Sequence, residues 1–126
     1  FTNISGIGDV DELVESLRNF VEHFRINKKK LAVWGAGHRT LALLSIATIS
    51  DIAFIVDSAD FKQGKYSPVM HSKIVSPETL EESDVDAVIV MVPGLYPDEV
   101  VKKIKSYSRS FEIYKLQDNK LISIEV

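Results

Sequence analysis

Short runs of purely apolar residues alternate with helical segments along this chain, and this alternation constrains the fold more strongly than any other feature. The runs are Leu31 to Trp34, Ile52 to Val56 and Ala87 to Val92. A strand that helices cover on both faces has this pattern, whereas a strand with one wet face alternates apolar and polar residues. The runs therefore predict a parallel sheet between two layers of helices.

An amphipathic helix is expected ahead of the first run. Between residues 9 and 26 the apolar side chains recur at intervals of three and four positions, which places them on one helical face. Asp9 follows Gly8 and stands three positions before Glu12, a capping-box pattern, so the helix is predicted to begin there. The other helices are predicted from His38 to about Ala47, from Ser76 to Leu80 and from Pro97 to about Tyr107.

The C-terminal segment has the pattern of a hairpin. Glu112 to Leu116 and Leu121 to Val126 are separated by Asp118-Asn119, residues that are typical of a turn. The last strand is apolar and can pair as an exposed edge with another chain, which leaves a homodimer open. Residues 1–126 are thus predicted to form a single Rossmann-like three-layer α/β domain, with a mostly parallel sheet and a C-terminal antiparallel hairpin.

The composition excludes several classes of chemistry. The 126 residues include no cysteine, which rules out disulfide frameworks, zinc fingers, iron–sulfur clusters and thiolate nucleophiles. A net charge of -3 gives no reason to expect nucleic acid or a membrane surface as a partner, and Lys28-Lys29-Lys30 is interpreted as a helix-to-strand junction. No apolar stretch approaches the ~20 residues of a membrane span. A cytoplasmic location is expected, and Phe1 in place of methionine suggests a piece of a longer protein.

The turn after the first run has the residues of a phosphate-binding turn. Gly35 and Gly37 lie where a strand passes into a helix, and glycines there let the backbone approach a phosphate at the positive end of the helix. Asp57 ends the second run at the position from which an acidic residue accepts hydrogen bonds from ribose hydroxyls. Thr40 replaces a third glycine, and its Cβ is expected to push the helix away from the strand. The alternative is that the glycines only make a tight turn.

A long polar segment from Ser58 to Ser72 lacks apolar periodicity and is predicted to be a loop. It contains Lys62, Lys65 and His71. At the carboxyl edge of a parallel sheet, such a loop can hold a phosphate or diphosphate by charge and hydrogen bonds. The alternative is a solvated loop whose glycine and proline residues only set turns.

Three further side chains are candidates near this edge. His38 and His71 have the imidazole of a general base or metal ligand, but no carboxylate cluster accompanies them, so no metal site is predicted. Tyr96 follows the third run and is a candidate to stack on a base or to donate to a sugar; its alternative role is to cap the next helix. The serines lack a Gly-x-Ser-x-Gly elbow, and no catalytic residue is predicted.

One series of motifs runs through most of the chain. Its members are Val33-Trp34-Gly35-Ala36-Gly37, Phe54-Ile55-Val56-Asp57, Lys62-Gln63-Gly64-Lys65-Tyr66, Pro68, His71 and Ile74-Val75-Ser76-Pro77-Glu78. From about Leu31 to Ile104, the order and spacing of the series resemble the C-terminal domain of S-adenosylmethionine-dependent C-methyltransferases that act on nucleotide-linked sugars. The chain departs from that pattern at Val69, where glycine is usual, and at His38-Arg39-Thr40 in the first turn.

The resemblance implies an accessory role in a larger enzyme. In that family a metal-binding domain and a methyltransferase domain that holds S-adenosylmethionine precede a domain that helps to bind the nucleotide-sugar. The first hypothesis is therefore a domain, not catalytic alone, that positions a nucleotide-sugar for a methyltransferase domain of the same or another chain. No cofactor is assigned to this domain itself. The ligand-binding candidates are Gly35, Gly37, His38, Asp57, Lys62, Lys65, His71 and Tyr96.

Two other functions stay open from the residues alone. One is a stand-alone nucleotide-binding, NAD-binding or regulatory module. The other is a structural or interaction domain whose glycine turn holds no ligand and whose long N-terminal helix docks onto a partner.

Overall fold

A six-stranded sheet forms the middle layer of the fold. The computed structural model describes residues 2–49, 51–66, 72–92, 96–108, 110–117 and 120–124. The strands are β1 (Leu31–Trp34), β2 (Ile55–Val56), β3 (Ile74–Val75), β4 (Ala87–Val90), β5 (Glu112–Gln117) and β6 (Lys120–Ile124). They lie in the order β3-β2-β1-β4-β5-β6, with β6 alone antiparallel to its neighbour. The predicted α/β fold, with a mostly parallel sheet and a C-terminal hairpin, is confirmed.

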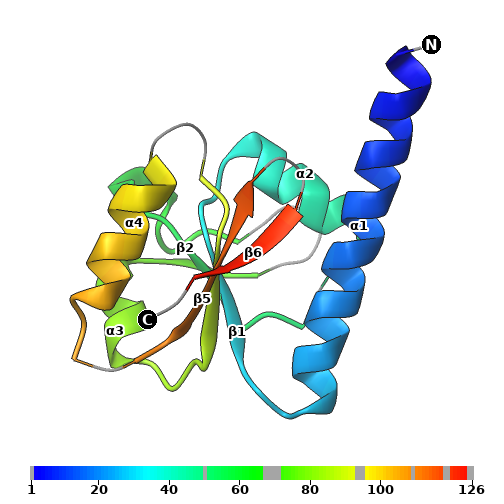
Figure 1. Ribbon diagram of the computed structural model, residues 1–126. Helices are drawn as coiled ribbons and strands as arrows, with labels where there is room; N and C mark the ends of the chain where they lie inside the picture. The colour runs from blue at the N-terminus through cyan, green and yellow to red at the C-terminus, as the bar shows by residue number, and fades with distance from the viewer. Residues whose placement is uncertain are drawn as a thin grey trace.

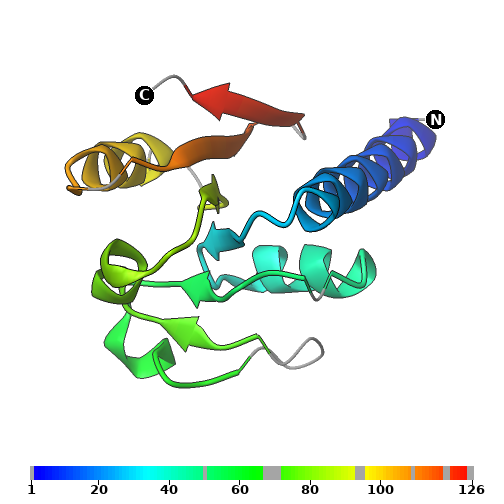
Figure 2. The same cartoon turned by 90° about the horizontal axis from the view of Figure 1, so that it is seen from below.

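Helices cover both faces of the sheet, as Figures 1 and 2 show. They are α1 (Thr2–Ile26), α2 (His38–Ile46), α3 (Pro77–Glu82) and α4 (Tyr96–Lys105), with a 3₁₀ turn η1 (Asp60–Lys62). In β1, Leu31 and Val33 pack into the core beneath α1 and α2, whereas Ala32 and Trp34 pack into the core beneath α3 and α4. Burial on both faces is the physical reason for the purely apolar runs. Within the described residues, no helix combines the length and apolar character that a membrane crossing needs.

α1 is longer than the sequence predicts. It begins at Thr2, so the predicted capping box at Asp9 is wrong, and Gly6 and Gly8 lie inside the helix. A glycine inside a helix costs only about 1 kcal/mol relative to alanine, which does not end a helix that packs on a sheet. The predicted apolar face is confirmed for the buried side chains of Leu13, Val14, Leu17, Val21 and Phe24.

α1 runs opposite to the parallel strands and extends past them. At 1.5 Å per residue its 25 residues span roughly 37 Å, whereas the 4 residues of β1 span roughly 13 Å. Figure 1 shows the N-terminal turns of α1 projecting beyond the edge at which the parallel strands end. This carboxyl edge is also where β1 passes into α2.

β3 is the strand that the sequence analysis misses. The backbone N–H groups of Ile55 and Asp57 donate to the carbonyls of Lys73 and Val75, at 2.9 and 3.0 Å, and so add a two-residue strand to the sheet. Two residues are too few to show a periodicity. β2 is likewise shorter than the predicted run from Ile52, because only its last two residues pair with neighbours on both sides.

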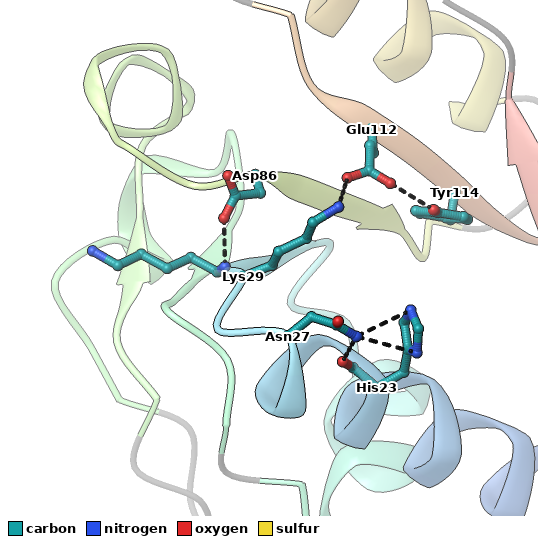
Figure 3. A network of polar contacts seen from close by, with 7 residues as sticks. His23, Asn27, Lys29, Asp86, Glu112 and Tyr114 are labelled. Carbon is teal, nitrogen blue, oxygen red and sulfur yellow. Dashed lines mark hydrogen bonds and ion pairs between the residues drawn. The ribbon is translucent and has the colours of Figure 1, made fainter.

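A polar network ties together the amino edge of the sheet (Figure 3). The backbone N–H of Lys30 donates to Oδ2 of Asp86 at 2.7 Å, and Nζ of Lys29 donates to Oε2 of Glu112 at 3.2 Å. Oε1 of Glu112 accepts from the Tyr114 hydroxyl at 3.0 Å. The lysine run therefore pairs with carboxylates at the starts of β4 and β5, which fits its interpretation as a helix-to-strand junction.

Tyr107 is expected to make the free energy of unfolding depend on pH in the alkaline range. Burial, and then the charges of Glu81 and Glu78, raise the pKa of Tyr107 above its ordinary value of about 10. Because the folded state holds this proton more tightly than the unfolded state, the free energy of unfolding is expected to fall as pH rises from about 10. In urea unfolding from about pH 8 to about pH 11, Tyr107→Phe should lose less stability than the parent chain. An equal loss in the variant contradicts this assignment.

Candidate functional site: the glycine turn at the carboxyl edge

Gly35 is packed tightly between two strand ends at the start of the glycine turn. Its φ is +122°, and a Cβ at this position would lie 2.7 Å from the backbone oxygen of Met91, just past β4. Its N–H donates to the Val56 carbonyl of β2 at 2.7 Å. Both the conformation and the close approach require glycine. At this position, the interpretation as a tight turn is sufficient.

Gly37 is different, because the described residues leave space around a side chain built there. Its φ of -77° suits any residue, and no described atom lies within 4 Å of a Cβ built there. It is the N-cap residue of α2 and, as a glycine, has no side chain with which to cap that helix. A helix N-terminus directs unpaired N–H groups outward and favours negative charge. The room for an anion at this turn is therefore beside Gly37.

Thr40 fastens α2 to the sheet. Its Oγ1 donates to the Met91 carbonyl at 2.9 Å, and the side chain is buried. The side chain that was expected to push the helix away is therefore the one that bonds it to the sheet. Its hydroxyl satisfies a buried carbonyl at the end of β4 and holds the first turn of α2 close to the strand.

Asp57 stands at the centre of the polar contacts at this edge. Its Oδ2 accepts the N–H of Ala36, the residue between the two glycines, at 3.0 Å. Its Oδ1 accepts the N–H of Ala59 at 2.8 Å. The side chain is only 15% exposed. The carboxylate thus holds the glycine turn from the neighbouring strand, while its acceptance of a ribose hydroxyl stays a prediction.

Lys62 reaches back from η1 to the same turn. Its Nζ donates to the Ala36 carbonyl at 3.3 Å and lies 3.7 Å from Oδ2 of Asp57. The side-chain amide of Gln63 donates to the backbone carbonyl of Asp57 at 2.9 Å, which fixes the chain that follows η1. The Lys62 side chain is 32% exposed, so its ammonium group is still reachable from solvent. The structure therefore brings the glycine turn, Asp57 and Lys62 together.

The remaining candidates are placed less directly. Lys65 is exposed, and in the described part of the chain no contact joins its side chain to the turn. His38 and Tyr96 are the first residues of α2 and α4, two helices that begin at the carboxyl edge (Figure 1). Their side chains, and all of His71, lie outside the described residues.

Phe61 is a neighbour of the turn that the sequence analysis missed. Its side chain is 72% exposed, and Nζ of Lys62 lies 5.8 Å from the centroid of its ring. The available signal was a single large aromatic residue beside a lysine in a polar segment that lacks apolar periodicity. In such a segment no helical or strand face exists to bury the ring.

The Lys62 ammonium and the N-terminus of α2 are the groups at this edge that favour negative charge, and Asp57 is paired with the ammonium. No described group of three or more His, Cys, Asp or Glu residues forms a metal site. S-adenosylmethionine would need an acceptor for its ribose hydroxyls. Each oxygen of Asp57 accepts one backbone N–H and can accept a second hydrogen bond, so these contacts do not distinguish the ribose of S-adenosylmethionine from the ribose of a nucleotide-sugar.

Comparison with known proteins identifies the family. Residues 7–111 match the family described as C-methyltransferase C-terminal domain. A solved structure, UDP-D-quinovosamine 4-dehydrogenase from Vibrio fischeri, aligns with a TM-score of 0.60 at 15% sequence identity, over 78% of this chain and 94% of that chain. At this identity the likeness shows the fold alone, and no curated protein sequence matches. Because the family match spans most of the chain, this protein belongs to the C-methyltransferase C-terminal domain family.

Proposed function

We propose that this domain binds a nucleotide-sugar at its carboxyl edge and positions the sugar for methyl transfer by a methyltransferase domain of the same or another chain. The observation that carries the proposal is the space that the described residues leave at Gly37, next to the Lys62 ammonium, which pairs with Asp57 and the Ala36 carbonyl. A diphosphate is matched by a cation together with backbone N–H donors. The family indicates the class of reaction. The protein of similar fold, UDP-D-quinovosamine 4-dehydrogenase, is named for a UDP-linked sugar.

The domain's contribution in this role is orientation. At the turn, the Asp57 carboxylate and the Lys62 ammonium are paired with each other. A nucleophile needs a neighbouring base to activate it, and each of these two groups is instead held by its ion-pair partner. Holding two reactants in a fixed geometry by itself lowers the barrier of a reaction between them. The N-terminal end of α1 lies on the carboxyl side of the sheet, so a methyltransferase domain joined there stands on the same side as the ligand (Figure 1).

The remaining candidates have supporting roles in the proposal. Lys65 lies on the same segment as Lys62 and adds positive charge to the approach of an anion. His38 and Tyr96 begin helices at the same edge, and His71 belongs to the same loop. A homodimer through the edge strand β6 is a separate proposal, which sedimentation velocity tests.

Calorimetric titration of this chain with a uridine diphosphate-sugar, uridine diphosphate and NAD tests the function. We expect the nucleotide-sugar to bind, and Lys62→Ala to weaken binding by about tenfold or more, because a charge-assisted contact to phosphate is lost. Lys105→Ala is the matched control, since it removes the same charge from the last turn of α4.

Three results contradict the proposal. If Lys62→Ala and Lys105→Ala weaken binding of the nucleotide-sugar equally, the effect comes from the net charge of the domain and not from a contact with Lys62. Tighter binding of NAD than of the nucleotide-sugar would favour a stand-alone dinucleotide module. No binding of any ligand in the panel would favour a structural domain.

A further inference from the structure

Phe61 is exposed in a way that the other described phenylalanines are not. Phe24 and Phe111 are buried, and Phe20 and Phe54 are partly buried against the two cores. The Phe61 ring, by contrast, is 72% exposed. A large apolar side chain left in water forgoes the burial that stabilises a fold. A single exposed ring is common on protein surfaces, so its meaning depends on the groups that lie beside it.

The backbone around Phe61 holds the ring in place. The residue is the middle one of η1, which is closed by hydrogen bonds from the Lys62 N–H to the Ala59 carbonyl at 3.0 Å and from the Gln63 N–H to the Asp60 carbonyl at 3.2 Å. The Asp57 carboxylate fixes the start of this turn through the Ala59 N–H. The ring is thus presented by a segment that is tied to the end of β2.

The Lys62 ammonium connects the ring to the glycine turn. Its Nζ is 3.3 Å from the Ala36 carbonyl and 5.8 Å from the centroid of the Phe61 ring. One exposed aromatic ring, one cation and the N-terminus of α2 therefore lie next to one another. In a nucleoside diphosphate, a flat base and an anionic diphosphate are likewise joined through a single ribose.

We propose that Phe61 is the stacking surface for the base of the bound nucleotide, with Lys62 at its phosphates. The inference rests on the proposed function and adds the residue that distinguishes a nucleotide from a bare diphosphate. Aromatic side chains stack on bases of any sequence because every base has a π face. A single ring offers at most about 200 Å² of contact, far below the ~800 Å² that each partner contributes to a stable protein interface. A small flat ligand suits it better than a second protein.

Calorimetry with uridine diphosphate and with inorganic diphosphate tests this inference. We expect Phe61→Ala to weaken uridine diphosphate by about tenfold or more and to leave the affinity for inorganic diphosphate unchanged. Phe61→Trp should retain the affinity for uridine diphosphate. Tyr66→Ala is the matched control. Tyr66 is also exposed, at 59%, but its backbone pairs with Lys73, which stands just before β3 and therefore away from the carboxyl edge.

The outcomes separate this inference from the proposed function. Unchanged affinity for uridine diphosphate in Phe61→Ala, or equal weakening of both ligands, overturns stacking while the phosphate site stands. A change of sedimentation coefficient in Phe61→Ala without a change in nucleotide affinity assigns the ring to contact between copies of the chain and also overturns it. If the parent chain binds neither ligand nor a nucleotide-sugar, the proposed function fails and the inference with it.

Discussion

Replacing Gly35 by alanine is expected to lower the free energy of unfolding by about 3 kcal/mol or more. The new Cβ would lie 2.7 Å from the Met91 oxygen and 3.0 Å from Cγ1 of Val92, at a φ of +122° that side chains other than glycine rarely adopt. The closest atom belongs to the backbone at the end of β4 and cannot swing aside. Relief therefore requires movement of β1 against β4, whose pairing forms the centre of the sheet.

Gly37→Ala is the matched control for Gly35→Ala, since the two positions are separated by a single residue. The described structure offers open space at Gly37 and an ordinary φ, so the variant should change the free energy of unfolding by at most about 1 kcal/mol, the scale of an N-cap preference. Urea unfolding followed by far-ultraviolet circular dichroism measures both variants. Equal destabilisation would show that the close approach at Gly35 is not what holds the turn.

Replacing Asp57 by alanine is expected to cost about 2 to 4 kcal/mol of unfolding free energy. The change removes the acceptor for the N–H groups of Ala36 and Ala59 and leaves the Lys62 ammonium without its carboxylate. Ala36 is only 4% exposed, so its N–H has little access to water as a substitute acceptor. Asp57→Asn keeps one carbonyl oxygen and should fall between the parent chain and the alanine variant.

Asp84→Ala is the control for the loss of a carboxylate. Asp84 pairs with Lys30 at 2.6 Å, but its side chain is 78% exposed, and exposed pairs contribute at most about 1 kcal/mol. The same urea experiment compares the variants. If Asp57→Ala is no more destabilising than Asp84→Ala, the carboxylate does not organise the turn, and its oxygens are available to a ligand.

The parts of the fold that were predictable are those in which burial acts on a whole element. β1 and β4 lie in the centre of the sheet and are buried at every position, so their composition alone marks them. β3 was not predictable, because its two residues are defined by pairing with β2 instead of by a pattern of their own. The start of α1 was misplaced because Gly8 carries the local signal of a helix end, whereas a glycine inside a helix costs only about 1 kcal/mol and does not by itself end it.

The candidate site was predictable in its location and not in its internal contacts. The spacing of Gly35, Gly37 and Asp57 along the chain placed them at one edge, as strand ends in a parallel sheet must be. The partners of Asp57 are backbone groups, whose positions depend on tertiary structure and leave no trace in residue types. For the same reason the hydrogen bond of Thr40 to the Met91 carbonyl was not predicted, and only a steric effect of its Cβ was expected. The exposure of Phe61 could not be predicted from its segment either.

The most direct test of the account is a titration of this chain, labelled with ¹⁵N, with a uridine diphosphate-sugar, followed by the chemical shifts of its backbone amides. Ligand binding at the carboxyl edge predicts that the amides of Ala36, Gly37 and Lys62 shift together with one dissociation constant. The amides of Asp86 and Glu112, at the opposite edge, should stay unchanged. Shifts confined to the amino edge or to β6, or no shifts at all, would contradict the assignment of this edge as the place where the nucleotide-sugar is held.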